Sequence, residues 1–228
     1  MKYLDMKLSK ASVWRIMVDH GFNPDSEVRN SGDWEKFIKS HFGVLAATDF
    51  FTIELLTCKG LVRCMVLFVI DIATRRVHIA GIRINPDGQW TEQIARNLTD
   101  YENGFLNGKK YLIHDRDLLF TKKFDDILGA VGVTSVKTVK RSPNLNAYAE
   151  RFVQTIKKEC LNHLILTNEE QLKYAVDQFI EHYNHERPHE NLDGKMIDPL
   201  PQDDDGEIIR FERLGGLLKS YRRIKQAA

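Results

Sequence analysis

Three acidic residues lie where the sequence indicates the ends of secondary-structure elements. Asp49 interrupts the apolar run VLAATDFFTIELL, whose aromatic and β-branched residues predict a strand. Asp115 follows the short apolar stretch 111–114, which predicts a buried strand ending at a polar loop. Glu150 lies just inside a helix predicted to begin after SPNLN, a stretch that supplies capping asparagines. Carboxylate oxygens are the preferred ligands of hard cations, so these positions predict one divalent-metal site.

The chemistry implied by such a site is cleavage or transfer of a phosphodiester. Three acids suit two Mg²⁺ or Mn²⁺ ions, and paired metals can activate an attacking oxygen and stabilise a leaving oxygen at phosphorus. The simpler alternative is that the three acids are ordinary surface charges. The chain has 32 Asp and Glu among its 228 residues, so any one acid taken alone would mean little.

Basic residues gather around the predicted glutamate helix. Between positions 137 and 158 there are six Lys or Arg and a single acid, Glu150. One side of the helix is apolar, and Glu150 and Lys157 fall together on another side. Such a patch would hold DNA phosphates near the metals, although a solvated helix face is the open alternative. The residues predicted to contact DNA are Lys140, Arg141, Asn146, Arg151, Gln154, Lys157 and Lys158.

The order of the predicted elements favours an α/β fold. Strands are predicted at 44–56, 61–72, 76–84, 111–114 and 133–138, and helices at 90–101, 124–131 and 171–185. The first three strands have short connections and read as an antiparallel meander. The result is a five-stranded mixed sheet flanked by helices.

Three stretches resemble the catalytic core of DDE transposases of bacterial insertion sequences, which are relatives of retroviral integrases with a ribonuclease H-like fold. They are IHDRDLLFT around Asp115, RSPNLNAYAERFVQTIKKECL around Glu150, and YNHERPHENL at 183–192. The resemblance spans roughly residues 40–200. It implies that Asp49, Asp115 and Glu150 are the catalytic metal ligands and that Lys157 contacts DNA. The enzyme would then expose a 3′ hydroxyl at an element end and use it to attack target DNA.

Other residues receive roles from the same resemblance. Asp71 is interpreted as a structural strand-end residue. Asp117 stands near the place where the family commonly has glycine, and it competes with Asp115 for the ligand role. His182, His185 and His189 fall at helical intervals, but Pro188 interrupts the helix and argues against zinc. Three residues of the stretch 183–192 are expected to brace the fold and not to perform chemistry: Tyr183, Asn184 and Arg187.

Three regions are expected along the chain. Residues 1–40 form an N-terminal helical segment, in which 9–20 resembles the last helix of a helix-turn-helix DNA-binding region. Only eight residues precede that helix, too few for the preceding helix of such a region, so we expect a fragment of a longer transposase or a start codon within an older gene. The favoured alternative is a helix that only packs on the core. Residues 41–200 form the integrase-type catalytic core, and 201–228 form an acidic linker and a basic C-terminal tail.

Composition sets limits on the function. The chain has no stretch long and apolar enough to span a membrane, and its three cysteines suit a reducing cytosol. The formal net charge is only +1, so the overall charge of the chain does not by itself indicate a nucleic-acid partner. The expected partners are transposon-end and target DNA and further copies of the chain, with no membrane and no organic cofactor. We expect a bacterial cytoplasmic protein that associates with the nucleoid when it is on DNA.

Two alternatives to an active transposase stay open at the level of sequence. One is an inactive transposase-derived remnant that only binds DNA. The other is a ribonuclease H-like nuclease that hydrolyses without strand transfer. The stretch RSPNLNAYAER favours the transposase over the nuclease, because it resembles the transposase family.

Overall fold

The computed structural model describes residues 36–138 and 147–225. The chain divides into two compact units, Met1–Phe42 and Gly43–Ala228. Of the first unit only a short helical stretch, 36–42, is described, and the helix predicted at 9–20 lies outside the described residues. All the strands described below belong to the second unit.

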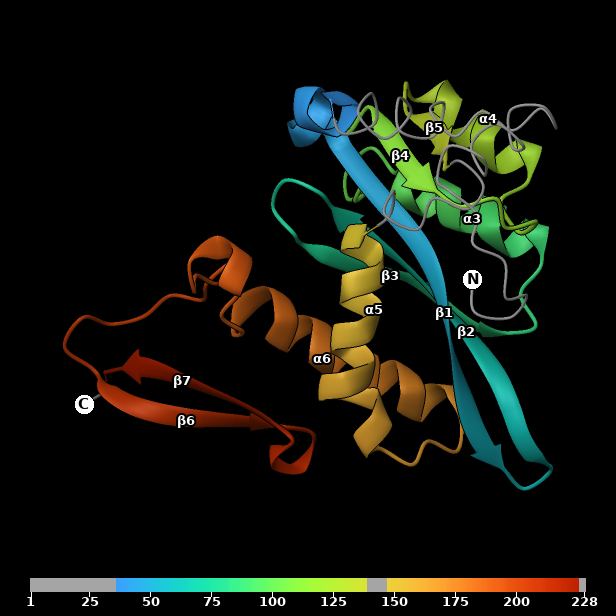
Figure 1. The fold of residues 1–228 in the computed structure, drawn as a ribbon. Coiled ribbons are helices and arrows are strands. Elements are labelled where there is room, and N and C mark those ends of the chain that lie inside the picture. Colours follow the sequence, from blue (N-terminus) through green and yellow to red (C-terminus); the bar gives the residue numbers. More distant parts are fainter. Residues whose placement is uncertain (1–35, 139–146, 226–228) are drawn as a thin grey trace, which may run out of the picture. The chain divides into compact units, whose positions relative to one another are not determined.

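The second unit is built on a mixed sheet with the strand order β3-β2-β1-β4-β5 (Figure 1). The strands are β1 (Leu45–Thr57), β2 (Gly60–Asp71), β3 (Val77–Ile84), β4 (Tyr111–His114) and β5 (Thr134–Lys137). The first three pair antiparallel, as expected of strands joined by tight turns, whereas β4 and β5 run parallel to β1 after helical crossovers. The predicted five-stranded mixed sheet is confirmed.

Four longer helices flank the sheet: α3 (Gly88–Leu98), α4 (Lys122–Ala130), α5 (Ala147–Glu159) and α6 (Glu169–His185). Three of them begin at a side chain that accepts a backbone hydrogen bond from the first turn, namely Asp87, Thr121 and Asn168. Figure 1 shows α3 and α4 close to β4 and β5, and α5 close to α6. Among the described residues, no helix has the length and apolar character needed to cross a bilayer.

The two faces of the sheet carry different cores. Phe50 of β1 points to one face, where it contacts the rings of Trp90 and Phe120. Phe51, the next residue, points to the other face and lies 6.0 Å from the Phe68 ring. Phe68 in turn lies 4.7 Å from Phe152 of α5, measured between ring centroids. Odd-numbered residues of β1 therefore face α5.

The segment expected to brace the fold does so through specific contacts. The buried amide of Asn184 accepts a hydrogen bond from the Val77 N–H and donates one to the Val77 carbonyl, so α6 is fixed to the start of β3. Arg187 donates two hydrogen bonds, of 2.8 and 2.7 Å, to the carboxylate of Glu159 in α5. Tyr183 packs edge-on against Phe152, which joins α5 and α6. These contacts confirm the bracing role.

The three histidines near the end of α6 have separate partners. His182 pairs with Glu186, His185 with the Asp198 carbonyl, and His189 with the Tyr183 carbonyl. Burial lowers the pKa of His182 and of His189, so burial favours their neutral form. These contacts give all three side chains structural partners within the fold.

The C-terminal region contains a hairpin that the sequence did not predict. β6 (Glu207–Arg213) and β7 (Leu218–Ile224) form a two-stranded antiparallel sheet where a linker and tail were expected. The hairpin is attached to α6 at Glu186, whose side chain is only 2% exposed. Arg213 lies 2.7 Å from this carboxylate, and the Ser220 hydroxyl donates to it over 3.1 Å. The local pattern of alternating polar residues did not show this tertiary contact.

Candidate active site

The parallel pairing of β1 and β4 determines where the two aspartates lie. Leu45 pairs with Tyr111, and Ala47 pairs with Ile113. The ladder ends at that pair, and its offset, if continued by two residues past it, would bring Asp49 beside Asp115. The negative charge of Asp115 acts on the Asp49 carboxyl, which agrees with this placement. Asp49 is an interior residue of β1, which runs on to Thr57, so the prediction that it lies at the end of its strand is wrong. It lies just past the stretch of β1 that pairs with β4, and Asp115 lies just past the end of β4. The strand register therefore supports the sequence prediction that these two residues share a site.

Glu150 reaches the same region from α5. Asp49 is directly opposite Phe68 in the β1–β2 ladder, so both side chains project from the face that α5 covers. Phe152 of α5 contacts Phe68, and Glu150 lies in the first turn of that helix and is exposed. The packing of one phenylalanine on another thus sets the helix over the strand that carries Asp49.

Electrostatics show that the acids act on one another. The pKa of the Asp49 carboxyl is raised to about 6, first by burial and further by the negative charges of Asp115, Glu150 and Asp117. A hydrogen bond from the Phe50 N–H to Asp49 Oδ1, 2.8 Å long, acts in the opposite direction. The geometry therefore places an acid that is costly to ionise among further acids.

Asp115 stands on a supported loop. Its Oδ1 accepts a hydrogen bond from the Asp117 N–H, and the Asp117 carboxylate accepts one from the Leu119 N–H. The fully buried His114 contacts the Asp115 carbonyl through Nδ1 at 2.6 Å and the Ser135 hydroxyl through Nε2 at 2.6 Å. Nδ1 must donate to the carbonyl, so in the neutral ring Nε2 accepts from Ser135. No local sequence pattern indicated this supporting role for His114.

Asp71 is occupied elsewhere. Its Oδ2 lies 2.8 Å from Lys109 Nζ, and its Oδ1 accepts a hydrogen bond from the Ala73 N–H at the start of the β2–β3 turn. The Asp71 carbonyl accepts from the Arg75 N–H, which closes that turn. These contacts agree with the structural role assigned to it from the sequence.

The predicted DNA-contacting residues separate into three groups. Lys157 shares the side of α5 with Glu150, and its Nζ lies 5.9 Å from the Phe51 ring centroid. Gln154 and Lys158 are exposed, and Arg151 is exposed on a different flank of the helix. The remaining three lie outside the described residues: Lys140, Arg141 and Asn146.

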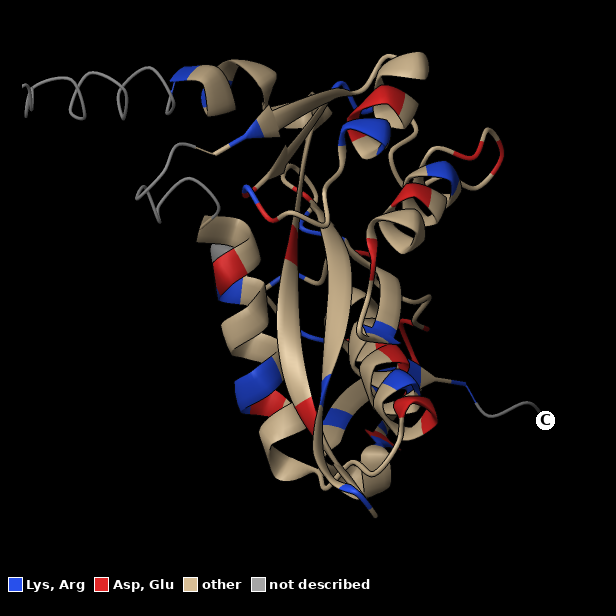
Figure 2. Ribbon diagram, turned by 90° about the vertical axis from the view of Figure 1, so that its right-hand side faces the viewer, with Lys and Arg blue, Asp and Glu red and all other residues tan. Residues whose placement is uncertain are grey.

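The side chains do not enclose a formed metal site. In residues 36–138 and 147–225, no group of three or more His, Cys, Asp or Glu side chains is placed to hold a metal ion. Lys, Asp and Glu residues alternate over the ribbon in Figure 2, and neither sign covers a whole side of it. The assignment of Asp49, Asp115 and Glu150 as metal ligands therefore stays a prediction.

Comparison with known proteins shows the class of this fold, which is the ribonuclease H-like fold found in integrase catalytic cores. Residues 131–196 match the family model described as integrase core domain. This match includes Glu150 and the bracing segment after it. No curated protein matches the chain.

Two solved structures show the same fold. The HTLV-2 integrase catalytic core domain, in complex with magnesium and in dimeric form, has a TM-score of 0.51 at 13% sequence identity. The similarity covers 68% of this chain and 93% of that one. A simian T-cell lymphotropic virus intasome in complex with the PP2A regulatory subunit B56 gamma also has a TM-score of 0.51, at 11% identity, covering 81% of this chain and 68% of that one. At these identities the likeness concerns the fold.

Proposed function

We propose that this protein is a divalent-metal-dependent polynucleotidyl transferase that cleaves DNA strands and transfers them during transposition. The observation that carries the proposal is the parallel β1–β4 pairing, which ends two residues before Asp49 and Asp115 and so brings these two acids to the same region, where the charge of Asp115 acts on Asp49. Glu150, on the helix that packs against the same face, completes an acidic set whose mutual repulsion contributes to the raised pKa of Asp49. The integrase core match, which includes Glu150, supports the same activity.

The acidic set fits a hard divalent cation, Mg²⁺ or Mn²⁺. Its donors are carboxylates, and the crowding of negative charge at Asp49 would be relieved by a cation. When bound, such ions would activate a water or a DNA 3′ hydroxyl and stabilise the charge that leaves phosphorus. The HTLV-2 integrase core, a structural neighbour, is described in complex with magnesium, which supports this choice.

The protein's own residues would position the DNA. Asp49, Asp115 and Glu150 hold the cations, and Lys157, seven residues after Glu150 on the same side of α5, orients a phosphate. Gln154 and Lys158 extend this contact along the exposed helix, and Lys140 and Arg141 are proposed to add to it from the preceding segment. No side chain acts as the nucleophile in this proposal.

The proposed partners are element-end DNA, target DNA and further copies of the chain. The structural neighbours support an assembly on DNA, because one is described as dimeric and the other as an intasome. We further propose an insertion-sequence origin and a bacterial cytoplasmic location, on the basis of the sequence resemblance.

The test is Mg²⁺-dependent nicking and strand transfer on end-labelled DNA. Wild type is compared with Glu150→Gln and with Glu170→Gln, which removes an exposed acid from the first turn of α6. We expect both products from wild type and from Glu170→Gln, and neither from Glu150→Gln. Equal activity in the Glu150 and Glu170 variants would overturn the assignment.

The products separate the proposal from its alternatives. Cut DNA without joined product would indicate a purely hydrolytic nuclease. DNA binding without any Mg²⁺-dependent product would indicate an inactive remnant. Either result would contradict the strand-transfer activity proposed here.

A further inference from the structure

A pocket lies on a flank of α5 different from the one that carries Glu150 and Lys157. Its volume is about 450 Å³, and it is formed by α5, the turn between β2 and β3, and the residues that follow α6. Figure 1 shows these segments close together beside the upper end of α5. The lining residues that matter to its chemistry are Arg75, Tyr148, Arg151, Thr155, Arg187 and Glu190.

The pocket and the acidic set are neighbours around one helix. Arg151 directly follows Glu150, so the two differ by about 1.5 Å along the helix axis and by about 100° around it. Tyr148, Arg151 and Thr155 lie on one stripe of α5, whereas Glu150 and Lys157 lie on another. A strand that crosses the first turn of α5 could therefore contact both sites.

Two arginines give the pocket its chemistry. The Arg75 guanidinium lies 3.8 Å from the centroid of the Tyr148 ring, and this stacking holds the plane of the guanidinium in place. Arg151 is exposed, and its guanidinium makes no hydrogen bond or ion pair with the described residues. The charge of Arg187 is taken up by the bidentate contact with Glu159. Arg151 therefore supplies the binding charge, and Arg75, held against Tyr148, lines the same pocket.

We propose that this pocket binds the phosphate group of a nucleotide. Guanidinium groups match phosphate oxygens in a bidentate geometry, and an arginine stacked on an aromatic ring loses little further freedom when it binds. The Thr155 hydroxyl donates to the Arg151 carbonyl over 2.8 Å, which holds the helix backbone on which Arg151 stands. The exposed Glu190 on the rim disfavours ligands with several closely spaced negative charges.

The phosphate has two possible sources, a DNA strand and a free nucleotide. The DNA source rests on the proposed function, because it requires that DNA passes the acidic set. The pocket's chemistry as a phosphate site does not depend on catalysis. Both sources can therefore be measured without metal.

The experiment measures binding by the full chain in the presence of EDTA, in a Glu150→Gln background. The probes are a fluorescein-labelled single-stranded oligonucleotide, followed by anisotropy, and a 5′-deoxynucleotide, followed by calorimetry. Arg151→Ala and Tyr148→Ala are compared with Arg96→Ala, which removes an exposed arginine from α3. Tyr148→Phe keeps the ring that Arg75 stacks on, and Arg151→Lys keeps the charge without the fork.

We expect Arg151→Ala to weaken binding about tenfold, and to lower the salt dependence of oligonucleotide binding by about one phosphate contact. Tyr148→Ala should weaken it about threefold, while Tyr148→Phe and Arg96→Ala bind like the parent. Arg151→Lys should recover only part of the loss. If Arg151→Ala weakens binding of the oligonucleotide, the phosphate in the pocket comes from DNA. If it weakens binding of the deoxynucleotide alone, the phosphate comes from a free nucleotide.

The proposal is overturned if Arg151→Ala and Tyr148→Ala bind both probes as Arg96→Ala does. If the parent binds the deoxynucleotide through Arg151 but binds no oligonucleotide, the pocket stands and the proposed function fails. If the oligonucleotide binds through Arg151 but no Mg²⁺-dependent product forms with the wild-type acids, the pocket stands without the transferase activity.

Discussion

Two carboxylates of this molecule show how opposite surroundings give opposite chemistry. Burial disfavours the charge on Glu186, but hydrogen bonds, led by the one from Arg213, lower its pKa to about 2. Burial also disfavours the charge on Asp49, and there the negative charges of Asp115 and Glu150 raise the pKa to about 6. Glu186 is a satisfied acid that joins the hairpin to α6. Asp49 accepts one backbone hydrogen bond and has only acids among the charged groups that act on it, so a cation would stabilise its ionised form.

The largest expected difference concerns catalysis. Asp49→Asn should reduce Mg²⁺-dependent strand cleavage about 1,000-fold, because it removes a charge that would hold a cation at the reacting phosphate. Glu186→Gln should leave the rate per folded molecule unchanged, since Glu186 contacts the hairpin and not the acidic set. Cleavage rates on labelled DNA, corrected for the folded fraction, test both statements. A similar loss of cleavage rate per folded molecule in both variants would contradict the different roles assigned to Asp49 and Glu186.

The next effect concerns stability. Glu186→Gln should lower the free energy of unfolding by about 3 kcal/mol at pH 7, because Arg213 keeps its charge and loses its partner. Urea unfolding measures this, with Glu181→Gln on the exposed side of α6 as the control. The folded pKa of Glu186 lies below its unfolded value, so the stability it contributes is present above about pH 4.5 and lost toward pH 2. A difference that persisted at pH 2 would contradict this account.

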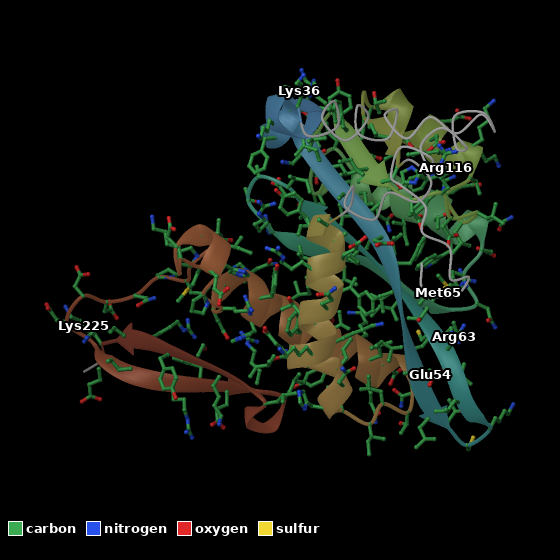
Figure 3. The ribbon with its side chains drawn as sticks, viewed as in Figure 1. Lys36, Glu54, Arg63, Met65, Arg116 and Lys225 are labelled. Carbon is green, nitrogen blue, oxygen red and sulfur yellow. The ribbon has the colours of Figure 1, made fainter. Side chains whose placement is uncertain are left out.

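The opposite sign is expected at Asp49. In EDTA at pH 7, Asp49→Asn should raise the free energy of unfolding by about 2 kcal/mol, because the folded protein no longer carries the disfavoured charge. The folded pKa lies above the unfolded one, so the stability of the protonated acid is present below pH 4 and lost as the pH rises through 6. The variant and wild type should therefore converge at pH 4. Glu54→Gln, which changes an exposed acid further along β1 (Figure 3), is the control.

The smallest expected effect concerns Lys157. Arg213 bonds directly to Glu186, whereas Lys157 shares a helix side with Glu150 and would meet a DNA phosphate instead. Lys157→Ala should weaken DNA binding about fivefold and lower its salt dependence by about one contact. Fluorescence anisotropy over a range of salt concentrations measures both. An unchanged salt dependence would place the phosphate elsewhere.

Much of the fold was predictable because its elements have strong local patterns. The strand 111–114 was predicted with the bounds it has in the structure, and the core side of α5 is buried at Ala149, Phe152 and Ile156 as its spacing predicted. The hairpin was missed because it depends on the Glu186 contact, which joins residues distant in the sequence. Alternating charged and apolar residues at 207–224 looked like a linker and a tail.

The candidate site was predictable in part for the same reason. Asp115 follows a strand and Glu150 lies in the first turn of a helix, and local patterns reveal both elements. Asp49 lies inside β1 and not at its end, and only the parallel pairing of β1 with β4 brings it near Asp115. Helical geometry alone predicts that Arg151 and Glu150, as adjacent residues, point to different sides of α5. The contact of Arg75 with Tyr148 could not, because only the packed fold brings the β2–β3 turn to α5.

The central claim is that Asp49, Asp115 and Glu150 act as one divalent-cation site. Its most direct test is the melting temperature of wild type, Asp49→Asn and Glu54→Gln as MnCl₂ is added to protein freed of metal with EDTA and then dialysed. Ligand that binds the folded state alone raises its stability in proportion to the logarithm of concentration above Kd. Wild type and Glu54→Gln should gain stability with Mn²⁺, and Asp49→Asn should start higher and gain little. An equal gain in all three proteins would contradict the claim.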